Sequence, residues 1–263
     1  MIISCLNGGL GNQIFQYATG LELSLKYDKP HFVNLLEYTL TSSRSDMLHS
    51  YIGLNTTGLP QDCQIFHEAR FAYDEISVAQ SAHLALVGYF QSWKYFPNAI
   101  QIIRQTWNRK YYSSGLPLLE EALVGKKIMS IHVRRGDYLT ETSLDYHGLV
   151  QDETYNEVVG RLVSNHQPDI VLGFSDDSNV LGEILGRLNI PSINVSGLRL
   201  GAFNEIMLMS KCSVRMIANS SFSWWGAYLS ILEDSYTYYP SQWFVNKHDF
   251  EPDDFFPSSW HAY

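Results

Sequence analysis

Short apolar runs alternate with amphipathic segments along the first half of this chain. Residues 2–6, 31–34 and 84–90 form compact apolar runs that predict strands. A helix is predicted after the first run, because apolar side chains recur there at helical spacing: Ile14, Tyr17, Ala18, Leu21 and Leu25. Asp28 and Pro30 end this helix, and Pro97 starts another that extends to about Trp107. The chain therefore opens with a strand–turn–helix unit of the Rossmann-like kind.

The second half repeats this alternation more regularly. Strands are predicted at 128–133, 169–174, 192–195 and 213–218, and helices at 152–163, 180–188, 202–212 and from about 219 to 232. Residues 111–125 form a linker region, and the tail from Tyr239 is predicted to be irregular. Such alternation predicts an α/β fold with parallel sheets. We place two Rossmann-like domains at residues 1–120 and 121–263.

The strand at 128–133 ends abruptly in Arg134, Arg135, Gly136 and Asp137. A buried strand that delivers two guanidinium groups to its carboxyl end is costly unless an anion binds there. Guanidinium forks match phosphate oxygens, and Gly136 would let backbone N–H groups approach the same anion. The alternative is a structural role, in which Asp137 and other carboxylates pair with both arginines.

Two further strand ends in the second half carry polar residues. The run at 169–174 leads into Asp176 and Asp177, and the run at 213–218 leads into Asn219, Ser220, Ser221, Phe222 and Ser223. These groups converge with the arginines only if the three strands are neighbours in one sheet. Fixed cations and the N–H groups of a helix start can stabilise a departing diphosphate without a metal. A carboxylate such as Asp177 can accept two hydrogen bonds from guanine, although the Asp176–Asp177 pair is also a candidate metal site.

Composition narrows the class of function. The net charge of −9 argues against a nucleic-acid partner, and the aromatic content of 14% suits either sugar binding or core packing. Three widely spaced cysteines, Cys5, Cys63 and Cys212, indicate a reduced compartment and no zinc site. We expect no signal peptide and no membrane-spanning segment, and hence a cytoplasmic protein, with peripheral membrane association and oligomeric state left open.

Three segments carry a resemblance to a known family. The sequence His132–Tyr138 resembles the His-x-Arg-x-x-Asp signature of the α-1,2-fucosyltransferases of glycosyltransferase family 11. Residues 8–18, with the turn Gly-Gly-Leu-Gly-Asn-Gln, resemble the opening of that family. Residues 88–96 resemble its segment Gly-Tyr-(aromatic)-Gln-Ser-x-Lys-Tyr-Phe, in which Tyr89, Phe90 or Trp93 could stack on an acceptor sugar or belong to the core. By geometry alone, the glycine turn could equally be a tight connection.

The resemblance implies a GT-B fold, with two Rossmann-like domains facing a cleft. It implies transfer of L-fucose from GDP-L-fucose, with inversion and without a metal or other cofactor, to the 2-hydroxyl of a terminal β-galactoside of a glycan. Arg134 is similar to the diphosphate-binding arginine, His132 and Asp177 to guanine-contacting residues, and Ser221–Ser223 to a phosphate-side loop. The glycine turn, with Gly11, Asn12 and Gln13, is placed near the transferred sugar and the acceptor.

The general base is left open by the sequence. Candidates close to the arginine motif are Glu141, Asp145, His147 and Asp137, and Thr142 stands where α-1,6 relatives have a glutamate. Asn12 matches an asparagine that some O-fucosyl relatives use in place of a formal base. We therefore expect Arg134, Asn12 and Asp137 to be catalytic, and Arg135 to share in substrate binding. The alternatives are a fucosyltransferase of another linkage or acceptor, and a non-catalytic binding module with Trp224, Trp225 and Tyr89 as sugar platforms.

Overall fold

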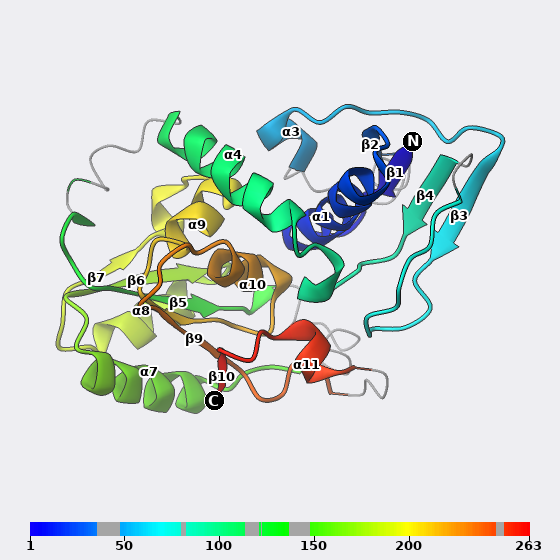
Figure 1. Cartoon of the computed structure of the whole chain (residues 1–263). Coiled ribbons are helices and arrows are strands. Elements are labelled where there is room, and N and C mark those ends of the chain that lie inside the picture. The colour runs from blue at the N-terminus through cyan, green and yellow to red at the C-terminus, as the bar shows by residue number, and fades with distance from the viewer. Residues whose placement is uncertain (36–47, 80–82, 114–120, 122, 137–147, 246–249) are drawn as a thin grey trace. The chain divides into compact units, whose positions relative to one another are not determined.

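The computed structural model describes residues 1–35, 48–79, 83–113, 121, 123–136, 148–245 and 250–263 (Figure 1). The chain forms two compact units, one of Met1–Thr106 with Asp249–Pro257 and one of Trp107–His248 with Ser258–Tyr263. The division falls between residues 106 and 107, whereas the sequence analysis placed it after residue 120. It lies within helix α4 (Ala99–Ser113), which is longer than the helix predicted to end near Trp107.

The first unit is built on a parallel sheet of four strands in the order β2-β1-β4-β3. The strands are β1 (Ile2–Cys5), β2 (His31–Asn34), β3 (Cys63–His67) and β4 (His83–Val87). The sequence did not predict β3, because an edge strand with mostly exposed or half-buried residues lacks an apolar run. The short helices of this unit are α3 (Leu48–Ile52), η1 (Trp93–Tyr95) and α11 (Pro252–Phe255).

Helix α1 (Leu10–Tyr27) packs directly on β1 and β2. Gly20 makes this approach feasible, because a Cβ there would lie 2.1 Å from Oγ of Ser4 and 2.4 Å from Nε2 of His31. Ser4 uses this closeness to donate a hydrogen bond of 2.8 Å to the carbonyl of Gln16. As predicted, the helix ends at Asp28, whose left-handed conformation (φ +49°) terminates it. The bond from Ser4 ties the middle of α1 to β1.

The second unit has a parallel sheet of six strands in the order β10-β9-β8-β5-β6-β7. The strands that the sequence predicted are β5 (Ile128–Val133), β6 (Ile170–Ser175), β7 (Ser192–Asn194) and β8 (Val214–Met216). The tail is less irregular than predicted, because β9 (Tyr236–Tyr239), α11 and β10 (His261–Ala262) lie in or next to it. These elements were missed because each spans only two to four residues.

Helices cover both faces of this six-stranded sheet (Figure 1). Helices α7 (Asp152–His166) and α8 (Ser178–Gly186) lie on one face, and α9 (Ala202–Met209) and α10 (Ser221–Tyr228) on the other. Side chains of alternate residues in β5 and β8 meet the first pair of helices in one core: Met129, Ile131, Val133, Val214 and Met216. The short η3 (Ser196–Leu198) follows β7. This layering confirms the predicted α/β class.

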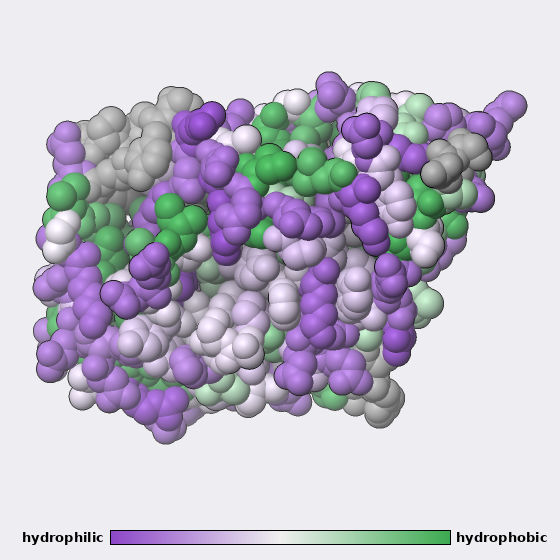
Figure 2. All heavy atoms as spheres, viewed as in Figure 1, coloured by the Kyte–Doolittle hydropathy of each residue, from purple (hydrophilic) through white to green (hydrophobic). Residues whose placement is uncertain are grey.

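Hydrophilic residues predominate on the face drawn in Figure 2, and hydrophobic residues form separate groups there. Among the described residues, no helix has both the length and the apolar character needed to cross a bilayer.

Candidate active site

The carboxyl ends of β8, β5 and β6 are adjacent, because these three strands are neighbours in one parallel sheet. Met129 of β5 pairs with Val214 of β8, and Val133 pairs with Ser175 of β6. The three polar strand ends that the sequence singled out therefore follow neighbouring strands. Their predicted convergence at one sheet edge is confirmed, and this edge is where open α/β sheets bind ligands.

Arg134 emerges at this edge and forms an ion pair with Asp176 from the neighbouring strand end, with Nη1 and Oδ2 2.7 Å apart. Both side chains keep about a quarter of their surface exposed, 22% and 25%. Gly136 permits the pair, since its φ is +22° and a Cβ there would lie 2.2 Å from Oδ2 of Asp176. The glycine thus makes room for the carboxylate of Asp176, whereas the sequence analysis assigned that space to a ligand anion. Asp176 is the partner that sequence reasoning had not assigned to Arg134.

Arg135 faces away from this pair and is 4% exposed. Its guanidinium pairs with Asp152 at the start of α7, lies 5.2 Å from the ring centre of Tyr155, and donates to the carbonyl of Arg134. Its backbone N–H donates to Oδ1 of Asp176 at 2.8 Å. These are the contacts of an arginine that holds the strand end in place, and they match the structural alternative for this residue. Its share in substrate binding stays a prediction.

His132 is buried in β5, with its ring 5.4 Å from that of Phe222 at the start of α10. Burial, with a smaller contribution from the charge of Arg134, lowers the pKa of His132 to about 3. The imidazole is therefore neutral at physiological pH and acts through hydrogen bonds. Its Nδ1 has no hydrogen-bond partner among the described residues, although a buried polar atom normally has one. The atom is also shielded from solvent, so the contact of His132 with guanine stays a prediction.

Asp177 caps α8. Its Oδ1 accepts hydrogen bonds from the backbone N–H groups of Asn179 (3.0 Å) and Val180 (3.2 Å). An aspartate N-cap stabilises a helix by about 1 kcal/mol, so Asp177 has a structural task in addition to any contact with a base. Its Oδ2 has no hydrogen-bond partner within the part of the chain that the structure describes. The contact of Asp177 with guanine stays a prediction. A substitution that preserves the helix cap can test it.

The segment Asn219–Ser223 leads into α10. Ser220 is the residue before the helix, and the free N–H groups of its first turn provide the dipole that the sequence analysis expected. Ser223 is fully buried, and its hydroxyl hydrogen bonds to the carbonyls of Ala218 and Ser220, so it supports the turn from within. Ser221 and Phe222 are half-buried, and Asn219 donates to the carbonyl of Gly148 at 3.4 Å.

Trp224 and Trp225 are fully buried, which removes them as sugar platforms. Trp224 stacks on Tyr228 with ring centres 4.6 Å apart and also contacts Trp260. Their large apolar surfaces anchor α10 in the core. Phe90 is likewise fully buried, whereas Tyr89 and Trp93 are half-buried. Of the predicted aromatic platforms, Tyr89 and Trp93 are the ones with exposed surface.

The glycine turn of the first unit is held by amide side chains of α1. The side chain of Gln16 accepts a hydrogen bond from the backbone N–H of Asn7. It donates to Oδ1 of Asn7 and to the carbonyl of Gly88, and each of the three bonds is 3.0 Å long. Gln13 is fully buried, donates to the carbonyl of Gly8 and accepts from the N–H of Leu48. Gln13 therefore has the bonds of a structural residue. Asn12 is half-buried and accepts a hydrogen bond of 2.8 Å from Gln91.

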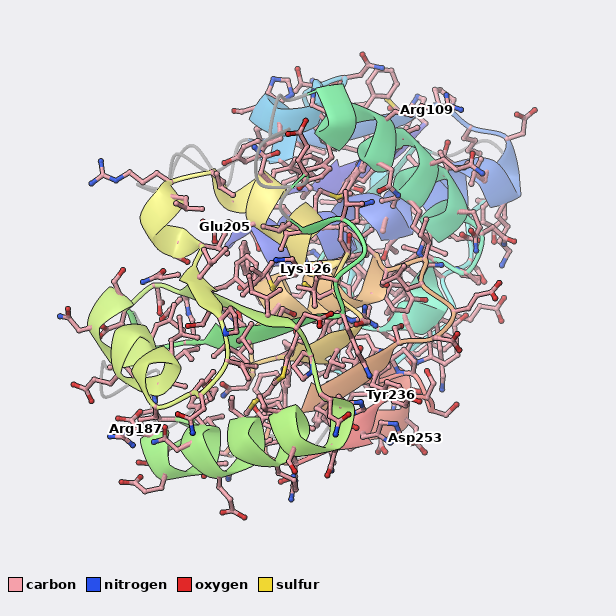
Figure 3. The ribbon with its side chains drawn as sticks, turned by 90° about the vertical axis from the view of Figure 1, so that its left-hand side faces the viewer. Arg109, Lys126, Arg187, Glu205, Tyr236 and Asp253 are labelled. Atoms are coloured by element: carbon pink, nitrogen blue, oxygen red, sulfur yellow. The ribbon has the colours of Figure 1, made fainter. Side chains whose placement is uncertain are left out.

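Another carboxylate, besides those of Asp176 and Asp177, follows β7 in the chain. Glu205, in the first turn of α9, accepts a hydrogen bond of 3.5 Å from Ser196, whose Oγ accepts from the N–H of Ser175 at the end of β6. Figure 3 shows Glu205 on the α9 side of the sheet, with α7 along the opposite side. The described residues contain no cluster of three or more His, Cys, Asp or Glu that could hold a metal ion. Metal independence stays a prediction.

Several candidates lie outside the described residues: Asp137, Glu141, Thr142, Asp145 and His147. The general base is therefore as open as the sequence left it.

Two units with parallel sheets and helical layers define an α/β fold of the GT-B type, as predicted. The solved structures that resemble it have this fold. The α-1,6-fucosyltransferase NodZ, co-crystallised with GDP, superposes with a TM-score of 0.53 at 13% identity, covering 87% of this chain and 92% of that one. POFUT1 in complex with GDP-fucose superposes with a TM-score of 0.52 at 10% identity, covering 90% and 96%.

The sequence comparison defines the family. The chain belongs to Glycosyl transferase family 11, whose sequence pattern matches residues 2–262. An Escherichia coli α-1,2-colitosyltransferase is 26% identical over 279 residues, with 96% of each chain covered. The O-antigen biosynthesis glycosyltransferase WbnK of Escherichia coli is also 26% identical, covering 92% of this chain and 94% of that one. Mouse galactoside α-(1,2)-fucosyltransferase 1 is 23% identical, covering 85% and 62%. Family membership thus agrees with the resemblance found in three short segments.

Proposed function

We propose that this protein transfers L-fucose from GDP-L-fucose to the 2-hydroxyl of a terminal β-galactoside of a glycan, with inversion and without a metal. One observation carries the proposal: Arg134 and His132 lie at the carboxyl end of β5, and α10 starts beyond the carboxyl end of the neighbouring strand β8. A cation and a helix N-terminus at such an edge suit the diphosphate of a nucleotide sugar. The relatives named for α-1,2-fucosyl and α-1,2-colitosyl transfer support the linkage.

In this proposal, each part of the site has its own task. Arg134 donates two hydrogen bonds to the β-phosphate, whose negative charge grows as the glycosyl bond breaks. The N–H groups at the start of α10 contact the same diphosphate. His132, neutral at physiological pH, contacts the guanine together with Asp177. Asn12 contacts the transferred sugar or the acceptor hydroxyl.

Colitosyl transfer is the second candidate, because a relative of matching length bears that name. Colitose is fucose without its 3-hydroxyl, so both donors present the same diphosphate and base to the site. A site that hydrogen-bonds the 3-hydroxyl would reject the sugar that lacks it, because buried polar groups would be left unpaired. Parallel assays with GDP-L-fucose and GDP-L-colitose, with lactose as the acceptor, decide between them.

Activity should survive removal of divalent metals. We expect GDP release from GDP-L-fucose and lactose to continue at an unchanged rate in excess EDTA, because Arg134 and the helix start supply the positive potential. NMR of the product should show a new α-1,2 linkage. Turnover that disappears in EDTA and returns with manganese or magnesium would contradict this and assign Asp176 and Asp177 to a metal.

Asp177→Asn separates the capping role from base recognition. Asparagine caps helices as well as aspartate does, so the melting temperature should stay close to that of the wild type. With its oxygen on the helix cap, asparagine presents an NH₂ donor where the N–H groups of guanine need an acceptor, and loss of a charge-assisted contact costs roughly 1.5–3 kcal/mol. We therefore expect the KM for the donor to rise about 10- to 100-fold, with saturated turnover much less affected.

The matched control is Asp169→Asn, which removes a carboxylate at the opposite end of β6. It should leave the donor KM unchanged. An unchanged donor KM in a folded Asp177→Asn protein would transfer base recognition to Asp176 or Glu205.

A further inference from the structure

Three strand ends of the first unit also meet at one edge of a sheet. Strands β1, β4 and β3 are parallel neighbours, and they lead into the glycine turn, the segment Gly88–Gln91 and Glu68, respectively. The sequence analysis singled out the first two segments and passed over Glu68. Glu68 follows the exposed edge strand that carries no apolar signal, so nothing in the sequence drew attention to it.

Glu68 uses both carboxylate oxygens to hold the segment after β4. Oε2 accepts from the backbone N–H of Tyr89 at 2.7 Å, and Oε1 accepts from that of Phe90 at 2.9 Å. A carboxylate that receives two successive backbone N–H groups fixes the orientation of both peptide planes. A Cβ on Gly88 would lie 2.3 Å from Cβ of Glu68, so glycine is required for this approach.

The segment adopts an unfavourable backbone conformation. Phe90 has a φ of +53° although it is not glycine, and it is fully buried. Such a conformation is unfavourable for a residue other than glycine and persists only where surrounding contacts impose it. Here those contacts are the two bonds from Glu68 and the burial of the Phe90 ring, which meets Tyr95 edge-on at 5.5 Å.

The outcome of this conformation is the placement of Gln91 and Tyr89 around Asn12. Nε2 of Gln91 donates to Oδ1 of Asn12 at 2.8 Å. A Cβ on Gly8 would lie 2.8 Å from Nδ2 of Asn12 and 3.4 Å from the Tyr89 ring, so both groups fill the space that Gly8 leaves. Because Gln91 holds Oδ1 of Asn12, the planar amide has one orientation, and its amino group Nδ2 can donate to a ligand.

We propose that Glu68 is a positioning residue of the transfer reaction: it holds the turn Gly88–Gln91, and through Gln91 it fixes the orientation of the Asn12 amide. This inference deepens the proposed function and rests on the role given there to Asn12. Glu68 touches no reacting atom in this scheme. Its contribution is to present Nδ2 of Asn12 in one orientation to the sugar or acceptor hydroxyl.

Glu68→Gln is the primary test, since glutamine has nearly the same shape but only one acceptor oxygen for the two N–H groups. Misplacement of a positioning group by about 1 Å can reduce rates 100-fold. We expect kcat to fall about 10- to 100-fold, with the Kd for GDP unchanged because the predicted nucleotide site belongs to the other unit. The matched control is Glu75→Gln, the same change at an exposed carboxylate that pairs with Lys26; its kcat should equal that of the wild type.

Gln91→Ala tests the same path without touching the backbone bonds of Glu68. We expect a similar loss of kcat in a protein of normal melting temperature. Since Glu68 and Gln91 act through Asn12, neither change should add more than about twofold to the defect of Asn12→Ala, whereas independent residues would give multiplied losses. A kcat within twofold of the wild type in folded Gln91→Ala, or multiplied losses in the double variants, would overturn the proposal.

An NMR measurement, which does not depend on turnover, tests the role of Glu68 independently of the proposed function. The side-chain amide of Asn12 gives a pair of NMR signals. This pair is assigned by its absence from the spectrum of Asn12→Ala. We expect this pair to shift in Glu68→Gln and Gln91→Ala but not in Glu75→Gln. If the wild type transfers neither sugar, the proposed function fails while the NMR result still decides whether Glu68 orients Asn12. Unshifted signals in both variants would overturn the inference whatever the activity.

Discussion

Arg134→Lys should remain folded and bind GDP-L-fucose, yet lose on the order of 100-fold or more in kcat. Lysine keeps the positive charge and can still pair with Asp176, so the ion pair that joins the two strand ends survives in part. What it loses is the planar fork that, in the proposed function, donates two aligned hydrogen bonds to one phosphate. Because the β-phosphate gains charge as the glycosyl bond breaks, this loss falls on the transition state more than on the ground state.

The neighbouring arginine provides the contrast. Arg135 is buried against Tyr155 and Asp152, so Arg135→Lys should lower the melting temperature while the folded protein keeps most of its turnover. Arg187→Lys, at an exposed arginine of the same unit, controls for the substitution itself. Melting temperature and kcat are measured on the same preparations. Near-normal turnover in folded Arg134→Lys would leave Arg134 with only its structural pairing to Asp176, and the proposed diphosphate site would lose its main cation.

The second large effect is expected for Asn12→Ala. We expect kcat to fall on the order of 100-fold, as removal of a hydrogen-bond donor to a developing charge typically does, with the Kd for GDP nearly intact. The backbone of the glycine turn should be unaffected, because Gln13 and Gln16 hold it. The loss therefore reports on the side-chain amide alone.

Isothermal titration with GDP and a coupled assay of GDP release separate the two quantities. Asn55→Ala, at an exposed asparagine of the same unit, is the control and should match the wild type in both. Normal turnover combined with weakened GDP binding would mean that the glycine turn holds the nucleotide, and the assignment of Asn12 to the sugar side would be withdrawn.

The sequence by itself determined the α/β class and most of the strands, and it located the polar residues that follow the strand ends. All six residues of Ile128–Val133 are buried, and the local pattern predicted this, because a strand covered by helices on both faces of a parallel sheet reads as a continuous, mostly apolar run. The glycine turn and the arginine pair were visible for a similar reason: their chemistry is unusual next to a buried strand.

Only the tertiary structure decided which partner each of these residues has. Strand order placed Asp176 beside Arg134 and sent Arg135 to α7, so two adjacent arginines with the same local signal received different contacts. Glu68 was invisible in the sequence because its importance comes from Tyr89 and Phe90, 21 and 22 residues away, whose N–H groups it binds. Trp224 and Trp225 are core rather than platform because α10 packs them inward. Local periodicity records whether a residue is buried, whereas its partner depends on which strands become neighbours, and that is a property of the whole chain.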